Sequence, residues 1–294
     1  MNLRKKKVSV FNILNITGFI VLGLIMLLPI LNVAAKAFSD EGNVIAGNIL
    51  FWPVNFQLST VKYVLTTPEF SKSFFVSVIV TLFGTAGAMF LTVTCAYPLS
   101  KPTLKGRKFF LYIFVFIMLF NAGMVPNYLL FSTLKLLNTI YALILSGMLS
   151  VFNVFLIKNY FESLPEVIEE AAKIDGASNM RIFFTIVLPM SLPVIATVTL
   201  FYSVGYWNNY FSGVMYITDP SLKPLQQYML DLVTQATSLQ DASGAFNDVN
   251  AAMNISGENV RSATIIVSTI PILVVYPYLQ KFFVKGITIG SVKG

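Results

Sequence analysis

Residues 170–193 read EAAKIDGASNMRIFFTIVLPMSLP, a polar, helix-forming stretch set between long apolar segments of the chain. Residues 136–157 before it carry no charged side chain, and the uncharged run 182–218 begins inside it. A polar insert between apolar segments gives a membrane protein a surface on which a partner in the aqueous phase can dock. This stretch therefore indicates both how the chain is organised and what kind of work it does.

The composition excludes an ordinary soluble protein. The chain has 56% hydrophobic residues, only 11% charged residues and no histidine, whereas soluble domains carry about 25% charged residues. Six uncharged runs approach or exceed the roughly 20 residues that a helix needs to cross a bilayer. They are residues 8–35, 73–100, 109–134, 136–157, 182–218 and 262–280.

These runs predict helices because backbone groups inside hydrocarbon must be hydrogen-bonded within their own segment. The alternating polarity of barrel strands is absent. We therefore predict an all-α integral membrane protein with six transmembrane helices in a single transmembrane domain, residues 1–294. The predicted spans are about 11–35, 74–98, 109–131, 137–160, 187–214 and 262–283, with polar loops at 162–186 and 219–260.

The lysines and arginines orient this arrangement. Fourteen of the 20 cationic residues fall on the side that holds both termini and the loop 162–186, and six fall opposite. Cytoplasmic loops are enriched in Lys and Arg, so both termini and this loop are predicted to be cytoplasmic in a multi-pass protein of the cell (plasma or inner) membrane. The cationic residues share no common face, so the net charge of +7 does not indicate nucleic-acid binding.

The external loop 219–260 is the longest polar segment. Within it, Leu225, Met229 and Leu232 recur at helical spacing and predict a short surface helix. The rest is rich in Ser, Asn, Asp, Gly and Ala, a composition typical of loops. The segment is either a plain connector or a docking site for an external partner, since long loops are often functional.

The cytoplasmic loop has its own start and stop signals. Ser163 is the predicted N-cap, and Gly176 is the predicted stop, because glycine readily adopts the left-handed conformation that ends helices. A second helix is predicted to start at Ser178 and run towards Pro189. Between these signals an apolar stripe recurs at helical spacing: Val167, Ala171 and Ile174.

The quoted stretch resembles the EAA loop of ABC importer permease subunits, in which Glu-Ala-Ala, Asp-Gly-Ala and a closing Leu-Pro recur at these spacings. The resemblance implies a type I ABC importer permease fold and covers nearly the whole chain. In that family the loop is the coupling helix that docks in a cleft of the ATP-hydrolysing subunit. The coupling residues that it implies are Glu170, Ala171, Ala172, Asp175, Gly176, Ala177, Leu188 and Pro189.

The C-terminus supports the same family. It reads KGITIGSVKG over residues 285–294 and is similar to the tail of maltose-type permease subunits, which reaches into the ATPase dimer. This resemblance implies tail contacts at Gly286, Gly290 and Lys293.

Aromatic and amide side chains cluster near the outer end of the fifth predicted span. Rings stack on the C–H faces of sugars and amides bind hydroxyls, so this cluster suits a carbohydrate pathway. Tyr202, Tyr206 and Tyr210 are predicted to share one helix face. An aromatic belt at the membrane interface is the alternative. The candidate pathway residues are Asn121, Tyr202, Tyr206, Trp207, Asn208 and Tyr210.

The chain lacks the Gly-rich phosphate loop with its Lys-Ser/Thr. It is therefore expected to be no enzyme itself, with no catalytic residue, metal site or bound cofactor, and with ATP and Mg²⁺ on partner subunits. The expected partners are a second homologous permease, two ABC ATPase subunits, an extracytoplasmic solute-binding protein, the lipid bilayer and a carbohydrate substrate. The resemblance implies import of oligosaccharides or other glycosides.

An ABC importer permease for a non-sugar solute and a stand-alone secondary transporter are the alternatives. A membrane-embedded enzyme is disfavoured, since the chain has no histidine, one cysteine and no carboxylate within the second to fifth uncharged runs.

Overall fold

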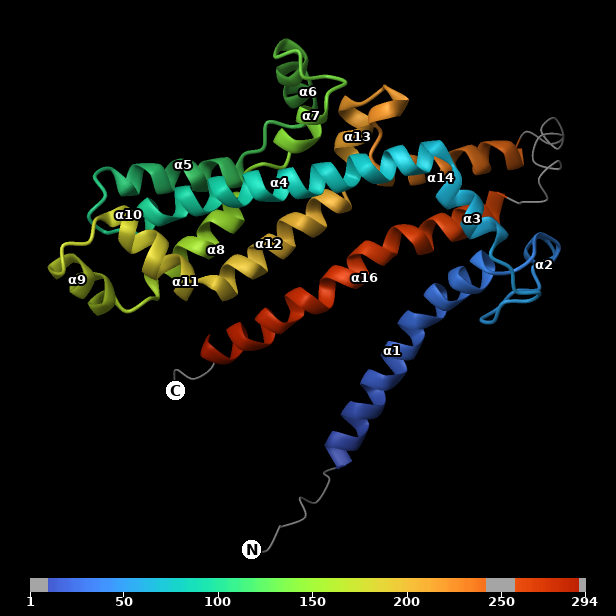
Figure 1. Cartoon of the computed structure of the whole chain (residues 1–294), viewed down its shortest axis with the longest axis horizontal. Helices are drawn as coiled ribbons and strands as arrows, with labels where there is room; N and C mark the ends of the chain where they lie inside the picture. Colours follow the sequence, from blue (N-terminus) through green and yellow to red (C-terminus); the bar gives the residue numbers. More distant parts are fainter. Residues whose placement is uncertain (1–9, 242–256, 291–294) are drawn as a thin grey trace, which may run out of the picture. The chain divides into compact units, whose positions relative to one another are not determined.

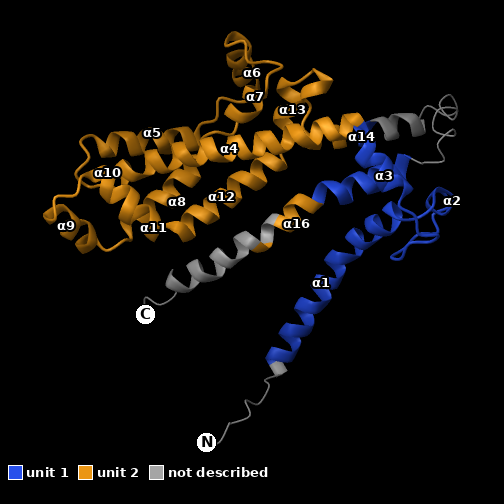
Figure 2. Cartoon of the chain, in the orientation of Figure 1, with its two compact units in different colours: residues 1–67, 231–269 blue, residues 68–230, 270–294 orange. Residues whose placement is uncertain are grey.

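The computed structural model describes residues 10–241 and 257–290, and every regular element within them is helical (Figure 1). The chain divides into two compact units, which are described separately (Figure 2). Unit 1 comprises residues 1–67 and 231–269, and unit 2 comprises residues 68–230 and 270–294. A single domain over residues 1–294 stays a prediction.

Unit 1 contains α1 (Val10–Ala37), α2 (Glu41–Ile45), α3 (Ser59–Thr66) and the first part of α16 (Gly257–Gly290). The apolar side chains of α1 are exposed over most of its length. Its last turn is fixed to the start of α16, because Lys36 Nζ lies 2.6 Å from Glu258 Oε1 and Asn259 Nδ2 donates to Ser39 O at 2.9 Å.

Unit 2 is organised around α4 (Pro68–Ser100), the long helix along which α8 (Val151–Glu162) and α12 (Leu192–Trp207) pack (Figure 1). Pro68 opens α4, where the missing N–H is no loss, and Glu69 suits the positive end of the helix dipole. The uncharged sequence from residue 73 to 100 then continues as one helix.

Small residues allow these helices to approach closely. Ala88 and Ala96 of α4 are fully buried. The Tyr206 ring of α12 fits between Gly84 and Gly147: a methyl group on Gly84 would lie 2.6 Å from Cζ of that ring. We call the buried contact of α4, α8 and α12 the helix seam.

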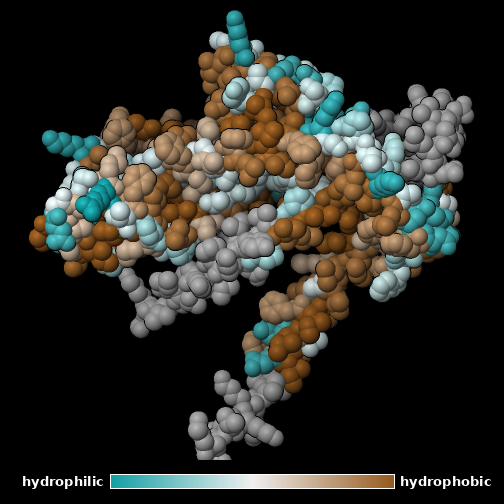
Figure 3. All heavy atoms as spheres, viewed as in Figure 1, coloured by the Kyte–Doolittle hydropathy of each residue, from teal (hydrophilic) through white to brown (hydrophobic). Residues whose placement is uncertain are grey.

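Two helices, Phe11–Ala37 and Pro68–Ser100, are long and apolar enough to cross a membrane within the described residues, and the total rises to four if each of two bent pairs is one span. Apolar side chains cover much of the molecular surface in view (Figure 3). Such exposure suits contact with lipid. Six spans and cytoplasmic termini stay predictions.

The predicted span 109–131 is not one helix. It is divided into α5 (Arg107–Leu119) and α6 (Met124–Thr133), which are bent by 111°. Gly123 has a φ of +85° and its N–H donates to Asn121 Oδ1 at 2.9 Å, so the segment between the helices is a side-chain-stabilised turn. Asn121 therefore lies in a turn, where the prediction had placed it inside a helix.

Two further predicted spans are also interrupted. Span 137–160 contains α7 (Ile140–Leu145) and α8, and the Ser150 Oγ caps α8 by accepting from Asn153 N. Span 187–214 contains α11 (Leu188–Met190), α12 and α13 (Phe211–Tyr216). Uncharged length alone did not reveal these breaks, because cap and turn residues within an apolar run carry no charge.

The helix expected near residue 225 is present as α14 (Leu225–Asp241), after the short 3₁₀ helix η2 (Pro220–Leu222). It is not entirely a surface helix: Leu225 is fully buried and its N–H donates to Ser77 Oγ of α4 at 2.7 Å. Within the loop 219–260, residues 242–256 lie outside the described residues.

Candidate functional site

The first helix of the polar loop is α9 (Glu166–Ile174), and it ends as the sequence predicts. Gly176 has a φ of +78°, its N–H donates to Lys173 O, and Ala177 N donates to Ala172 O at 2.9 Å. This pair of bonds satisfies the last carbonyls of the helix in a glycine-dependent C-cap. The stop at Gly176 is confirmed.

The predicted start at Ser163 is wrong. Ser163 is the C-cap of α8, and its Oγ donates to Tyr160 O at 2.7 Å. Pro165 disfavours helical backbone at Leu164, so one helix ends before the proline and the next begins after it. Pro165 itself, with extended backbone, precedes α9.

The two faces of α9 differ in their surroundings. Ala172 packs against the core of unit 2, and Glu169 is half-buried. On the other face, Val167 is 73% exposed and Ile174 is 87% exposed. We call the surface formed by Val167, Glu170, Ala171 and Ile174 the outer face of α9; all four are exposed.

An ion pair fixes the inner face to the end of α4. Lys101 Nζ lies 2.5 Å from both Glu169 carboxylate oxygens and 4.8 Å from the centre of the Tyr97 ring. Lys101 follows α4 directly in the chain. This ion pair is a direct contact between α9 and the residue that follows α4.

A second set of ionic contacts joins the α4–α5 connection to α8. Arg107 pairs with Glu162, and Lys158 Nζ lies 2.8 Å from the same carboxylate. Arg107 Nε also donates to Leu99 O at 2.8 Å. The end of α4, the start of α5 and the end of α8 are thus joined by these contacts.

The second half of the loop is only partly as predicted. Ser178 caps α10 (Asn179–Ile182) by accepting from Arg181 N, as expected. The helix then widens into the π-helical segment η1 (Phe183–Val187) before α11, and the whole is bent by 78° from α12. Pro189 removes an N–H and crowds the preceding turn, which accounts for the irregular end.

Some of the remaining coupling candidates are exposed and others are packed against the core of unit 2. Asp175, Gly176 and Pro189 are exposed, whereas Ala177 and Leu188 pack against the core of unit 2. Gly286 and Gly290 lie within α16, and Lys293 lies outside the described residues. Contact of any of these residues with an ATPase stays a prediction.

Among the pathway candidates, Tyr202 and Tyr206 are buried in the helix seam. The Tyr202 and Thr92 hydroxyls share a hydrogen bond of 2.7 Å, and Ser150 N donates to Tyr202 at 3.0 Å. The Tyr206 hydroxyl donates to Ile144 O at 2.7 Å. Both hydroxyls therefore bind α4 or the α7–α8 region, and their role in substrate binding stays a prediction.

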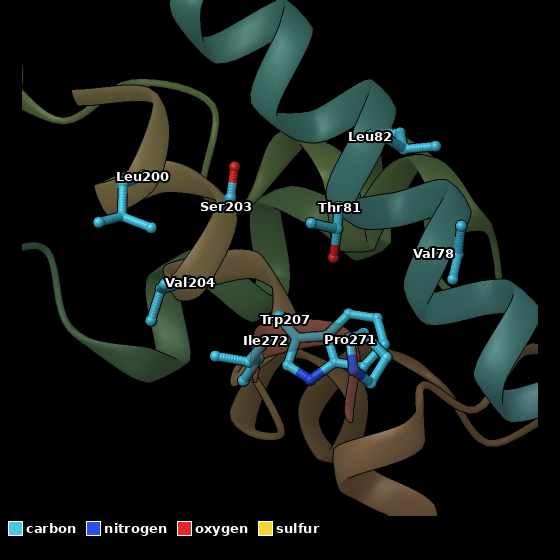
Figure 4. Close-up of a pocket in the computed structure, with 9 residues that line it drawn as sticks. All are labelled: Val78, Thr81, Leu82, Leu200, Ser203, Val204, Trp207, Pro271 and Ile272. Atoms are coloured by element: carbon cyan, nitrogen blue, oxygen red, sulfur yellow. The ribbon is translucent and has the colours of Figure 1, made fainter. Parts of the chain in front are cut away.

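Trp207 is buried beside a cavity of about 210 Å³ (Figure 4). Its Nε1 and the Thr81 Oγ1 have no hydrogen-bond partner among the described residues. The other walls are almost entirely apolar, which does not suit a sugar. They are Val78, Leu82, Leu200, Ser203, Val204, Pro271 and Ile272.

The predicted stripe of three tyrosines does not form. Helix α12 ends at Trp207, Asn208 is its C-cap, and Tyr210 precedes α13 as an exposed side chain. The end of α12 therefore breaks the helical spacing between Tyr206 and Tyr210. Asn208, Tyr210 and Asn121 are exposed and stay candidates for a pathway.

Sequence reasoning missed three contacts that organise the unit: the Lys101–Glu169 pair, the glycine cradle of Tyr206, and a clamp at Asn138. Asn138 Oδ1 accepts from Thr218 N at 2.6 Å and Asp219 N at 3.0 Å, and the Asn138 φ is +55°. Partners far apart in the chain left no local signal.

Within the described residues, no cluster of three metal-ligating side chains occurs.

The described residues form apolar helices together with α9, a capped helix with one exposed face. These features are typical of a transport permease. The family of binding-protein-dependent transport system inner membrane components matches residues 10–289, and the chain belongs to this family. It is thus a membrane permease subunit of an ABC transporter with the type I fold, and ATP hydrolysis takes place in separate subunits.

Two curated relatives come from Bacillus subtilis (strain 168). Protein LplC is 43% identical over 97% of this chain and 95% of that protein. The polygalacturonan/rhamnogalacturonan transport system permease protein YtcP is 40% identical over 95% of this chain and 97% of that protein.

A solved structure is also similar. It is a crystal structure of a bacterial ABC transporter involved in the import of the acidic polysaccharide alginate. The matching chain has a TM-score of 0.87 and 31% identity, and the match covers 96% of this chain and 100% of that chain. The family implies a complex with a partner permease, an ATPase and a solute-binding protein.

Proposed function

We propose that this chain is one of two pore-forming subunits of an ATP-driven importer for oligosaccharides, with six spans and cytoplasmic termini. The partners are a second homologous permease, two ATPase subunits and an extracytoplasmic solute-binding protein. Family membership removes the stand-alone secondary transporter from consideration. Three of the similar permeases are named for polygalacturonan/rhamnogalacturonan, for galactooligosaccharides and for melibiose/raffinose/stachyose, which supports a carbohydrate.

The observation that carries the proposal is the two-faced α9. Its outer face leaves Val167 and Ile174 uncovered, while its inner face is held to α4 by Glu169 and Lys101. Exposed apolar side chains around a carboxylate, here Glu170, are suited to burial against a partner. When the ATPase subunits close, they would push on the outer face, and the ion pair would pass that displacement to α4 and the helix seam.

Two solute classes are compatible with this machine. No charged residue lies in the uncharged runs 73–100, 109–134, 136–157 and 182–218, which favours a neutral oligosaccharide. Two of the similar proteins handle polygalacturonan or alginate, which favours an oligosaccharide with acid groups. An acidic solute would need its positive charges from the other permease or from the binding protein.

The proposal is tested by reconstituting the complete complex in vesicles and measuring solute-stimulated ATP hydrolysis and uptake. Neutral oligosaccharides and uronate oligosaccharides of equal length form the two arms. We expect stimulation by one arm, and we expect Glu170→Arg to abolish it while the unfolding temperature of the permease subunit is unchanged. A complex that responds to neither arm, or that responds equally with Glu170→Arg, would overturn the proposal.

A further inference from the structure

A groove with two chemically different ends lies between the last part of α4 and the segment formed by α10 and η1. Its volume is about 810 Å³. We call it the amphipathic groove. Its polar end is formed by Lys101, Thr103, Lys105, Lys173 and Asn179, and its middle by Phe90, Thr94, Tyr97, Phe183 and Phe184.

The polar end is positively charged. Lys101, Lys105 and Lys173 line it, and Glu169 is the one acidic residue among the lining side chains. Glu169 is already bound to Lys101. Lys105 and Lys173 are exposed and form no ion pair within the described residues. Two cationic groups are therefore available to an anion here.

The apolar end continues into a second cavity of about 270 Å³ that shares Phe90, Thr94, Phe183 and Phe184 with the groove. Met89, Val93, Leu188 and Ile195 extend this surface along α4 and towards α12. Phe90 is 68% exposed and Phe184 is 62% exposed. A ligand that covers these side chains has to be apolar at this end.

The length of the surface fits one leaflet of a membrane. From Met89 to Lys101 the helix and its last turn rise roughly 18 Å at 1.5 Å per residue, and half of a hydrocarbon core is about 15 Å. Helix α4 is itself long and apolar enough to span a membrane. The cationic end thus lies at the depth of lipid headgroups when the aromatic end lies among acyl chains.

We propose that the amphipathic groove binds an anionic phospholipid. The phosphate contacts Lys105 and Lys173, and one acyl chain lies along Phe90 and Phe184. Basic pockets beside membrane helices suit acidic headgroups. Because Lys173 belongs to α9 and Lys105 to the α4–α5 connection, the bound lipid bridges the same two parts as the Lys101–Glu169 pair.

The experiment uses the complete importer complex in lipid nanodiscs. Two photoactivatable probes carry the same diazirine acyl chain, one with a phosphatidylglycerol headgroup and one with phosphatidylcholine. Cross-linked residues are mapped by mass spectrometry. We expect the phosphatidylglycerol probe to label residues 89–98 and 183–188 much more than the phosphatidylcholine probe does.

Variants separate the headgroup contact from general charge. The double variant Lys105→Ser/Lys173→Ser should lower phosphatidylglycerol labelling of the groove roughly tenfold or more. Lys108→Ser is the matched control, since Lys108 is exposed and close in sequence but does not line the groove. All three lysines are exposed, so the variants should fold, which gel filtration checks.

Two results would overturn the inference. Equal labelling by both probes would show ordinary surrounding lipid without headgroup recognition. No lipid labelling, together with cross-linking of a Thr103→Cys variant to a partner subunit by a thiol-attached photo-cross-linker, would show that a protein segment fills the groove. The readout is labelling and not transport, so it stands apart from the identity of the imported solute.

Discussion

The helix seam and the outer face of α9 differ in burial: the seam encloses its apolar and polar side chains, whereas the outer face exposes them. In the seam, the Tyr202 and Tyr206 hydroxyls bind neighbouring helices and Ala88 is fully buried. On α9, Val167 and Ile174 are left uncovered within a polar loop. The seam is buried within this chain, whereas nothing in the described part of the chain covers the outer face.

This difference separates two kinds of substitution. Changes in the seam should lower the stability of the subunit by itself. Changes on the outer face should leave that stability intact and weaken association with the ATPase. Variants in each region therefore test the comparison directly.

The largest effect is expected at Gly84. In Gly84→Ala the added methyl group meets the Tyr206 ring at 2.6 Å, and Gly147 backs that ring. In Gly87→Ala, the matched control, the methyl group meets only the flexible end of Met148. Overpacking typically costs about 1–3 kcal/mol. The free energy of unfolding of Gly84→Ala should therefore be about 2–3 kcal/mol lower than that of Gly87→Ala. Thermal unfolding in detergent measures it, and equal stabilities would contradict the tight seam.

The next effect concerns the outer face. Ile174→Asp puts a charge at the most exposed apolar position of α9 and should weaken ATPase binding by about 2 kcal/mol, roughly thirtyfold. The unfolding temperature of the subunit should not change. Ile45→Asp in α2, where the side chain is 69% exposed, is the control and should retain the ATPase. Co-purification at graded ATPase concentration measures the difference, and full retention by Ile174→Asp would remove the outer face as a docking surface.

A smaller effect is expected where the two regions meet. Lys101→Glu and Glu169→Lys each place like charges together and should cost about 1 kcal/mol, since both side chains are partly exposed. Each should lower the amount of solute transported per ATP hydrolysed, and the double exchange should restore it. Lys108→Glu serves as the control. A double variant as defective as either single one would show that the pair does not link α9 to α4.

The smallest effect is expected for Tyr202→Phe, which removes the hydroxyl shared with Thr92 and Ser150 N. Polar contacts between membrane helices average about 0.6 kcal/mol, so the unfolding temperature should fall slightly and the KM for solute should not move. Tyr210→Phe, at an exposed position, should not change stability. A raised KM with unchanged stability would instead assign Tyr202 to the solute pathway.

The sequence predicted the parts that depend on local chemistry. Long uncharged runs located the helical regions, and Gly176 ended α9 as expected because a left-handed residue is needed there. The breaks at Gly123 and Ser150 were missed, because turn and cap residues inside an apolar run do not change its hydropathy.

The missed part of the site has a different cause. The Lys101–Glu169 pair joins residues that are separated in the chain by the four helices α5 to α8, and nothing in the local pattern of either residue specifies the other. The apolar stripe of Val167, Ala171 and Ile174 was predicted. Its exposure, however, depends on which face of α9 packs against the rest of unit 2. That choice is made by long-range packing of Ala172 and Leu188 against the core.

The clamp at Asn138 has a consequence for biosynthesis. Its amide oxygen accepts from the backbone N–H groups of Thr218 and Asp219, which are synthesised 80 and 81 residues later. At about 5–20 residues per second, the ribosome adds those residues roughly 4–16 s after Asn138. During that interval the Thr218 and Asp219 N–H groups that bind Asn138 do not yet exist. The loop between α6 and α7 therefore gains these stabilising hydrogen bonds only after α13 has been made.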